Sequence, residues 1–344
     1  MTSNRSGPLV SVCIPTYNGA AFLEQTLASV AAQTFEEFEV LIVDDGSSDE
    51  TIAIAERFAA TDERARVIRN AQRAGSSAAN ANRCLEYARG EWIKLLFQDD
   101  LMAPACLAGM LDAGQRRPLV IAWHDYLFAP DTPADVREFY ETLPTVRGVL
   151  PGSYASPEAV CTAVVRHFGV NFIGPTSSSL VRRDCFARFG AFNPGISMFP
   201  DLEFWMRVGS NEGIAIARES LVTFRVHNRS ISAQLREDPG SAFRYQLQWL
   251  LTFLLLARSP HYANFRKRAL ACDPPFDARA RLMQEAFDAR WVAVDARFRG
   301  RDHALLAQWA TFCQRHPEMP EVLREMDAQL PLWSKVRQFL KARL

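Results

Sequence analysis

The sequence predicts an α/β fold, in which a Rossmann-like, mostly parallel sheet is flanked by helices and followed by an α-helical extension at the C-terminus. First, strand-like and helix-like segments alternate repeatedly within the first 100 residues, as they do where crossover helices join parallel strands. Second, this alternation stops near Gln234, and residues 241–312 carry apolar residues at helical spacing. We therefore expect two regions, 8–235 and 236–344.

Each expected element of the first region has its own pattern. The predicted strands are short runs of apolar and β-branched residues between turn formers, at 10–15, 38–43, 66–69 and 92–97. Apolar residues at helical spacing follow at 22–32 and again at 80–89. In between, Ser47 with Glu50 three residues later has the pattern of a capping box, which predicts the start of another helix.

The composition excludes several classes of protein. A length of 344 residues suits one large domain with an extension, or two domains. Basic and acidic residues balance at 39 each, so no charge excess indicates a nucleic-acid partner. Seven scattered cysteines without CxxC spacing favour reduced thiols in a cytoplasmic setting. The N-terminus lacks the apolar core of a signal peptide, and the longest apolar run, 249–257, is too short to span a bilayer.

Polar residues follow three of the predicted strands at the point where each strand ends. In chain order they are Thr16, Tyr17 and Asn18, then Asp44 and Asp45, then Asp99 and Asp100. Because the carboxyl ends of parallel strands meet at one edge of a sheet, we expect a ligand site there. The chain has neither GxGxxG after its first strand nor a P-loop motif, so a nucleotide would be held by side chains and a metal ion.

Asp99 and Asp100 form an adjacent pair of acids that calls for an explanation. Two like charges repel, and no basic residue stands beside them in the sequence. Carboxylates at a strand end bind Mn2+ or Mg2+, which can bridge a diphosphate and offset the charge that develops as it departs. The alternative is a pair of solvated turn residues.

Five segments resemble, in their order along the chain, the motifs of family 2 glycosyltransferases. They are PTYNG (15–19), QTF (33–35), VDDGSSDET (43–51), NRCLEYARGEWI (82–93) and QDD (98–100). Members of this family have the GT-A fold and transfer a sugar from a nucleotide diphosphate with inversion. The resemblance covers about residues 8–235 and implies a metal-dependent inverting glycosyltransferase. Gln98 departs from the family's DxD motif, whose last aspartate usually meets the metal; this implies Asp100, with His227, as metal ligands.

The segment FPDLEFWMRV (199–208) is similar to the acceptor-site motif of the same family. Asp201 takes the position of the catalytic base, and an inverting transfer needs one carboxylate to remove the proton of the acceptor hydroxyl. Asp201 would also suit the N-cap of a helix over 202–208, and both roles can coexist. The resemblance further assigns four residues to the sugar and acceptor site, namely Gly174, Thr176, Glu203 and Trp205.

The resemblance also implies a nucleotide site. Tyr17 lies in the first loop, where a nucleobase stacks, and Asp45 would accept the N3–H of uracil or thymine, although guanine also presents N–H donors. Arg73 lies in a loop where a basic residue approaches the base or phosphate. The complete set implied is Pro15, Thr16, Tyr17, Asn18, Asp45, Arg73, Asn82 and Asp99.

These expectations define a reaction but not a substrate. The donor is a nucleotide-diphosphate sugar, with UDP favoured over dTDP or GDP, and the acceptor is a hydroxyl of a glycan or lipid-linked molecule in cell-surface polysaccharide or glycolipid synthesis. Two alternatives stay open. A sugar nucleotidyltransferase should carry a glycine- and lysine-rich loop after its first strand, and a non-catalytic nucleotide-sugar-binding protein should have lost the base.

The C-terminal segment Leu332–Leu344 has the pattern of a basic amphipathic helix. Its apolar residues recur at helical spacing, and it carries four positive charges and no acid. Such a helix can lie in a membrane interface that contains anionic lipids, which would place the protein peripherally on the inner face of the cytoplasmic membrane. The alternative is that the apolar stripe packs on the catalytic domain.

Overall fold

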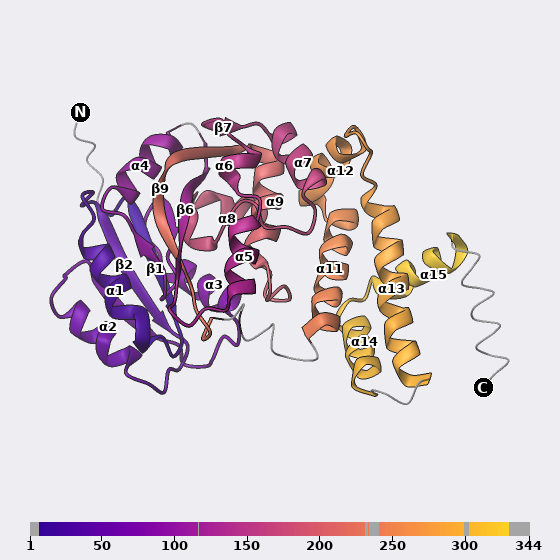
Figure 1. The fold of residues 1–344 in the computed structure, drawn as a ribbon, viewed down its shortest axis with the longest axis horizontal. Coiled ribbons are helices and arrows are strands. Elements are labelled where there is room, and N and C mark those ends of the chain that lie inside the picture. The colour runs from indigo at the N-terminus through magenta and orange to yellow at the C-terminus, as the bar shows by residue number, and fades with distance from the viewer. Residues whose placement is uncertain (1–6, 116, 231–232, 234–240, 299–302, 330–344) are drawn as a thin grey trace. The chain divides into compact units, whose positions relative to one another are not determined.

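The structure is a computed structural model that describes residues 7–115, 117–230, 233, 241–298 and 303–329 (Figure 1). The chain divides into two compact units, Met1–Ala233 and Gln234–Leu344. The segment Leu332–Leu344, for which membrane association is predicted, lies outside the described residues.

Within the described residues, nine strands of the first unit form one sheet, in the order β3-β2-β1-β4-β8-β6-β9-β5, with β7 also paired to β9. The first four strands are parallel to one another, as the alternation predicts. Antiparallel pairing of β8 with β4 and β6 makes the complete sheet mixed. The strands are β1 Val10–Thr16, β2 Phe38–Asp44, β3 Ala65–Arg69, β4 Trp92–Leu95, β5 Leu101–Met102, β6 Leu119–Phe128, β7 Tyr154–Ala155, β8 Ser179–Arg182 and β9 Ile214–Val226.

Helices cover both faces of this sheet. Val10, Val12 and Ile14 of β1 join the apolar core that α1, α2 and α4 cover, whereas Cys13 points the other way and meets Cys84 of α3. Burial on both faces explains why the central strands read as continuous apolar runs. The helices of this unit are α1 Ala20–Ala31, α2 Thr51–Ala59, α3 Ser77–Tyr87, α4 Cys106–Gly114, α5 Ala134–Thr142, α6 Val146–Val149, α7 Pro157–Arg166, η1 Thr176–Ser178, α8 Asp184–Phe189 and α9 Pro200–Glu212.

The predicted capping box at Ser47 is wrong. Helix α2 begins at Thr51 with Glu50 in the N-cap position. The hydroxyl of Ser47 instead donates to Asp44, and it accepts the backbone N–H of Asn18 at 2.9 Å. Ser47 therefore joins two loops at the sheet edge, because a serine in this loop can serve either the helix or the neighbouring strand end.

The second unit is helical in its described part, as the sequence predicts. Phe253, Phe265 and Phe276 pack together in its core. Arg258 binds Glu321 and Glu325 across the helices. None of the helices within the described ranges is long and apolar enough to cross a membrane. The elements are α11 Ser241–Arg258, η2 Pro260–Tyr262, α12 Ala263–Leu270, α13 Ala278–Phe298, α14 His303–Arg315 and α15 Met319–Gln329.

Candidate active site

The loops after β1 and β2 are held together at the carboxyl edge of the sheet. Thr16 and Asp44 are neighbours in register, and the Thr16 hydroxyl donates to the Asp44 carboxylate at 3.1 Å. Asn18 adopts a left-handed φ of 47°, and its side-chain oxygen accepts the backbone N–H of Ser48 at 2.8 Å. Pro15 and Thr16 are buried within β1, so only their backbone is suited to meet a ligand, and that contact stays a prediction.

Tyr17 and Arg73 come together at the mouth of these loops. The Tyr17 side chain is 41% exposed, and the guanidinium carbon of Arg73 lies 4.1 Å from its ring centroid. Such stacking of a cation on an aromatic face is favourable, and it presents two flat groups to a planar ligand. The structure thus brings together two residues that the sequence assigned separately to the nucleotide.

Asp45 organises the loop that carries Arg73. Its buried carboxylate accepts hydrogen bonds from the side chain of Asn70 at 2.9 Å and from the backbone N–H groups of Ala74 and Gly75. A carboxylate with these partners fixes the loop, and this is an internal role that the sequence did not indicate. Contact of Asp45 with a nucleobase stays a prediction.

Two asparagines of α3, Asn80 and Asn82, bind different parts of the first unit. The side chain of Asn82 binds the backbone of Phe192 through both its oxygen and its nitrogen, at 3.0 and 2.8 Å. Its amide is therefore committed away from the nucleotide loops, which corrects the expectation for Asn82. Asn80 instead donates to the backbone oxygens of Thr16 and Val43, at 3.2 and 3.1 Å. In the sequence, the position of Asn80 among the apolar residues of a helix could have indicated that its amide binds the backbone inside the protein.

The acid pair lies close to the first loop. Gln98 binds the backbone of Tyr17 in both directions, at 2.9 Å to its N–H and 3.0 Å to its oxygen. The next residue, Asp99, has a side chain that is 24% exposed, with one oxygen 3.1 Å from Nε2 of His227. His227 in turn packs against the ring of Phe22. Asp99 and His227 thus form an acid–imidazole pair in which the carboxylate is accessible and the imidazole is buried.

Asp100 is not the exposed ligand that the sequence predicted, because it is only 1% exposed. Its carboxylate accepts the hydroxyl of Ser177 at 2.5 Å and the backbone N–H of Arg225 at 3.2 Å. Burial, together with the charge of Asp99, raises the pKa of Asp100 well above its ordinary value. The carboxylate that is free to meet a cation is that of Asp99.

Two cations approach the acid pair in space, although none is adjacent in sequence. Lys94 of β4 is fully buried, and Arg225 of β9 is 6% exposed. Burial lowers the pKa of both groups, while the charge of Asp100 opposes that shift. Within the described part of the chain, Nε and Nη2 of Arg225 have no hydrogen-bond partner. In the sequence, the position of Lys94 inside the apolar run WIKLLF could have indicated a buried cation.

Asp201 lies in the first turn of α9, which begins at Pro200 with Phe199 as N-cap. The alternative role of Asp201 as N-cap is therefore wrong, since proline takes the first helical position. One carboxylate oxygen accepts the N–H of Leu202 at 2.8 Å, and the other accepts the hydroxyl of Thr176 at 3.3 Å. Burial nevertheless raises the pKa of Asp201 to about 6. A carboxylate with this pKa is suited to accept a proton near neutral pH.

Glu203 and Trp205 do not line an acceptor site, because both are buried inside the unit. Glu203 accepts two hydrogen bonds from the guanidinium of Arg207, at 3.1 and 2.8 Å. Arg207 also donates to the backbone oxygen of Ala191 at 2.9 Å. Trp205 packs edge-on against Phe204. The expectation failed because α9 turns these side chains into the core.

Gly174 lies beside Asn171 and His124, near Asp201. Its φ is 116°, and a Cβ added there would lie 2.8 Å from Cε1 of His124. The Asn171 amide donates to the Gly174 oxygen at 3.0 Å and also hydrogen-bonds Asp201. Burial lowers the pKa of His124 to about 4. The structure therefore brings Gly174 and Thr176 to the candidate base, and it adds His124 and Asn171.

Asp99 and His227 offer two ligands for a divalent cation, fewer than a complete coordination shell. Of the described residues, no three His, Cys, Asp or Glu side chains are arranged to enclose a metal. Asp99 and His227 are in contact at 3.1 Å, with the carboxylate accessible. Mn2+ and Mg2+ commonly take few protein ligands and complete their shell with phosphate oxygens and water. The pair could therefore hold such an ion together with a substrate diphosphate.

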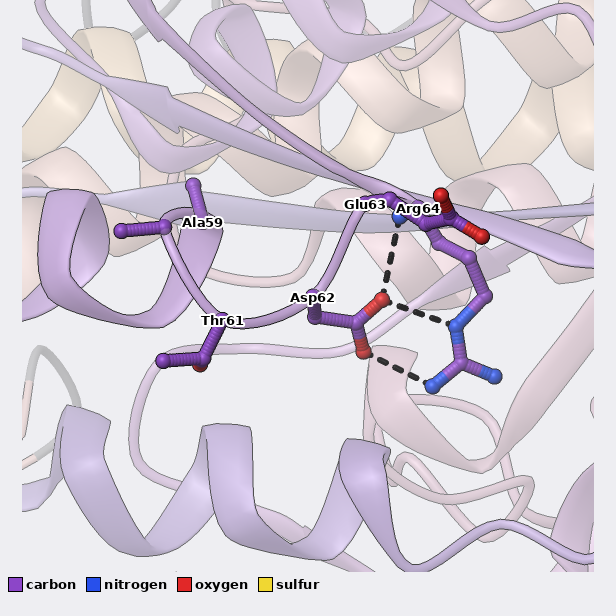
Figure 2. A pocket seen from close by; sticks show the side chains of 6 residues that line it. Ala59, Thr61, Asp62, Glu63 and Arg64 are labelled. Carbon is purple, nitrogen blue, oxygen red and sulfur yellow. Dashed lines mark hydrogen bonds and ion pairs between the residues drawn. The ribbon is translucent and has the colours of Figure 1, made fainter.

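A surface hollow lined by residues 59–64 lies away from this site (Figure 2). It precedes β3, at the amino end of the parallel strands, whereas the acids lie at their carboxyl ends. Asp62 binds the Arg64 guanidinium at 2.9 and 2.7 Å, and that guanidinium also covers the ring of Phe38. These charges satisfy each other and stabilise the turn.

Residues 11–170 match the model of Glycosyl transferase family 2. The N-terminal unit belongs to this family. An uncharacterized protein of Mycobacterium tuberculosis, MT1568, is 32% identical over 207 residues, which are 60% of this chain and 63% of that protein. The putative teichuronic acid biosynthesis glycosyltransferase TuaG of Bacillus subtilis is 35% identical over 130 residues, or 37% of this chain and 51% of TuaG. The chain thus spans less than two thirds of either relative.

Solved glycosyltransferases share the fold. TarS 1–349 of S. aureus, in complex with UDP-GlcNAc, superposes with a TM-score of 0.56 at 17% identity, covering 76% of this chain and 72% of that one. The mannosyltransferase PcManGT of Pyrobaculum calidifontis, in complex with GDP-Man and Mn2+, gives 0.53 at 20% identity, covering 96% and 88%. The family 2 unit therefore has the GT-A architecture of nucleotide-sugar-binding neighbours.

Proposed function

We propose that the N-terminal unit is an inverting glycosyltransferase that moves a sugar from a nucleotide-diphosphate donor to a hydroxyl of a glycan or lipid-linked acceptor. One observation carries the proposal. The adjacent residues Thr176 and Ser177 donate hydrogen bonds to Asp201 and Asp100, respectively. A candidate base and the acid pair therefore lie on either side of one short segment, as a reaction between two substrates requires.

In this proposal Asp201 removes the proton of the acceptor hydroxyl while that oxygen attacks the anomeric carbon. Attack opposite the diphosphate breaks the bond from the sugar to the phosphate oxygen and inverts the configuration. Mn2+ or Mg2+ bound by Asp99 and His227 would offset the negative charge of the departing nucleotide diphosphate. Arg225 lies beside the acids with unpaired N–H groups among the described residues, so it can donate to the same phosphate oxygens.

The donor class is less sharply defined than the reaction. Tyr17 and Arg73 offer a stacking site for any planar base, which is compatible with UDP, dTDP or GDP. TarS is in complex with UDP-GlcNAc and PcManGT with GDP-Man, so the shared fold accommodates both bases. We favour UDP. For the acceptor, the name of TuaG points to a cell-surface polysaccharide. We place the reaction in the cytoplasm, with peripheral membrane attachment through Leu332–Leu344.

The proposal is tested by incubating the purified full-length chain with UDP, dTDP and GDP sugars in the presence of Mn2+. We expect release of one nucleotide diphosphate, loss of that release in EDTA, and loss in an Asp201→Asn control when acceptor is present. Turnover of a nucleoside triphosphate with a sugar 1-phosphate would identify a nucleotidyltransferase instead. Binding of a nucleotide sugar without turnover, in the presence of glycan and lipid-linked acceptors, would identify a binding protein.

A further inference from the structure

Lys94 is a charged side chain in the interior of the first unit, where lysine is rarely found without a partner. Its ammonium donates to the backbone oxygen of Ser177 and lies 3.4 Å from that of Ser179. Removing an ammonium from water is costly unless hydrogen bonds and a counter-charge compensate. The two carbonyls supply hydrogen bonds, and the nearby Asp100 carboxylate opposes the effect of burial.

Lys94 follows the last residue of β4 that pairs with β8. In the described chain, β4 and β8 pair through Trp92 with Arg182 and through Ile93 with Val181. The next residue of β4 is Lys94, so the backbone ladder stops where the lysine begins its reach toward Ser177 and Ser179. Beyond Ile93, the Lys94 ammonium links β4 to the backbone oxygens of Ser177 and Ser179.

The segment held by this ammonium reaches the acids on both sides. Ser177 accepts the N–H of Phe97 at 3.0 Å and donates to Asp100. Thr176 donates to Asp201 at 3.3 Å. Within the segment, the Ser179 hydroxyl donates to the Thr176 oxygen at 2.7 Å. Movement of residues 176–179 would therefore shift Asp100 and Asp201 together.

We propose that Lys94 is a positioning residue for the transfer reaction, because its ammonium fixes residues 176–179 and thereby sets Asp201 relative to the acid pair. This inference rests on the proposed function. It separates Lys94 from the nucleotide contacts, since Tyr17 and Arg73 sit on loops held by Asp44, Ser47 and Asp45. Loss of the ammonium should therefore reduce the rate of transfer and leave nucleotide affinity nearly unchanged.

The first test replaces Lys94 with methionine, which keeps most of the length of the side chain and removes the charge. We expect kcat to fall by about 10–100-fold, the cost of a small misplacement of reacting groups. The Kd of the nucleotide diphosphate released in the donor screen should stay close to that of the wild type. The milder variant Lys94→Gln, whose amide can still donate, should show an intermediate kcat and covers the case in which Lys94→Met fails to fold.

A matched control is Glu39→Gln on β2, which is separated from β4 by β1 in the sheet. Glu39 is also buried and charged, bound by Ser11, Arg66 and Arg89, but it lies at the amino end of its strand. It should lower Tm without lowering kcat. A similar loss of kcat in Glu39→Gln would show that the Lys94 effect is general destabilisation and would overturn the proposal.

A double-mutant cycle with Thr176→Val tests the connection itself. If Lys94 acts through the segment, Lys94→Met and Thr176→Val together should lose little more kcat than the larger single loss, because residues in one hydrogen-bond network are coupled. Full additivity would overturn the proposal. Amide hydrogen exchange at residues 176–179 should be faster in Lys94→Met and unchanged in Glu39→Gln. If the wild type released no nucleotide diphosphate, the proposed function would fail, whereas unchanged exchange would refute the role of Lys94 independently.

Discussion

Asp99 and Asp100 are chemically identical neighbours that the fold places in different surroundings. Asp99 retains solvent contact beside His227, whereas Asp100 is enclosed by Ser177 and the backbone of Arg225. Because only an accessible carboxylate can exchange water for a cation without unfolding its surroundings, the two acids should respond differently to substitution. The difference is a property of single residues and is testable by single variants.

We predict that Asp99→Asn weakens the response to Mn2+ and that Asp100→Asn does not. In the donor-release assay, the Mn2+ concentration for half-maximal activity should rise by about 10–100-fold or more for Asp99→Asn. Asp100→Asn should keep the wild-type concentration, since that carboxylate is bound inside the protein. A larger increase in this concentration for Asp100→Asn than for Asp99→Asn would identify Asp100 as the metal ligand.

The pH dependence of the rate should follow the ionisation of Asp201. Its pKa is raised to about 6 by burial, and only the ionised form can take the acceptor proton. We predict that kcat/KM falls as the pH drops below about 6, with the slope of one proton. The residual activity of Asp201→Asn should lack this limb. A limb that persists in the variant would belong to another group.

The same pKa predicts a change in stability. A carboxyl whose pKa in the folded chain exceeds its ordinary value of 3.8 favours folding when protonated, and that contribution is lost as the pH rises through about 6. At pH 8, Asp201→Asn should therefore raise the free energy of unfolding, by at most about 3 kcal/mol. Urea unfolding at pH 8 and pH 4 measures this, and the gain should disappear at the lower pH.

Asp201→Asn should also separate rate from affinity. We predict a transfer rate reduced by about 10²–10⁴-fold, the usual contribution of a positioned proton acceptor. The affinity for the nucleotide sugar, measured by titration calorimetry, should stay near that of the wild type, because the base meets the acceptor. A parallel loss of affinity would assign Asp201 to the donor site.

At the scale of one element, α9 holds Asp201 through a buried ion pair further along the helix. Glu203 and Arg207 are both almost fully buried, and Arg207 also binds the backbone oxygens of Phe189 and Ala191. Glu203 therefore anchors the helix that presents the base, although it does not itself face a substrate.

We predict that Glu203→Ala destabilises the chain strongly, because it leaves the Arg207 guanidinium buried without its carboxylate. The free energy of unfolding should fall by about 3–5 kcal/mol. Urea unfolding at neutral pH is the measurement, and Glu86→Ala is the control, since its pair with Arg83 is exposed and worth at most about 1 kcal/mol. Equal effects of the two substitutions would contradict the anchoring role.

At the scale of the whole molecule, the chain combines a family 2 unit with a helical unit and a basic terminal segment. We predict that the full chain co-sediments with anionic phospholipid vesicles at low salt and that a chain ending at Pro331 does so less. Binding should weaken as salt rises, because the surface potential is screened, and should be small on neutral vesicles. Equal, negligible binding by both chains would leave the segment without a membrane role.

Local sequence patterns were sufficient to predict the α/β class, the parallel order of the first strands, the helical second unit and the sheet edge that carries the candidate site. These follow from local periodicity and from polar residues at strand ends, which are properties of short segments. Tyr17 and Asp99 follow predicted strand ends, whereas Arg73, Thr176, Asp201 and His227 were indicated by the resemblance to family 2 glycosyltransferases. Their proximity in space agrees with the expectation that strand ends meet at one edge.

Which acids and cations are buried, and which groups they contact, follows from long-range packing. Burial of Asp100, Glu203 and Trp205 depends on elements far away in the chain, so no local pattern could distinguish these residues from exposed ones. Lys94 and Arg225 approach the acid pair because β4 and β9 belong to one sheet, although more than a hundred positions separate them in the sequence. Long-range packing sets solvent access and charge neighbours, and these determine which carboxylates are free to react.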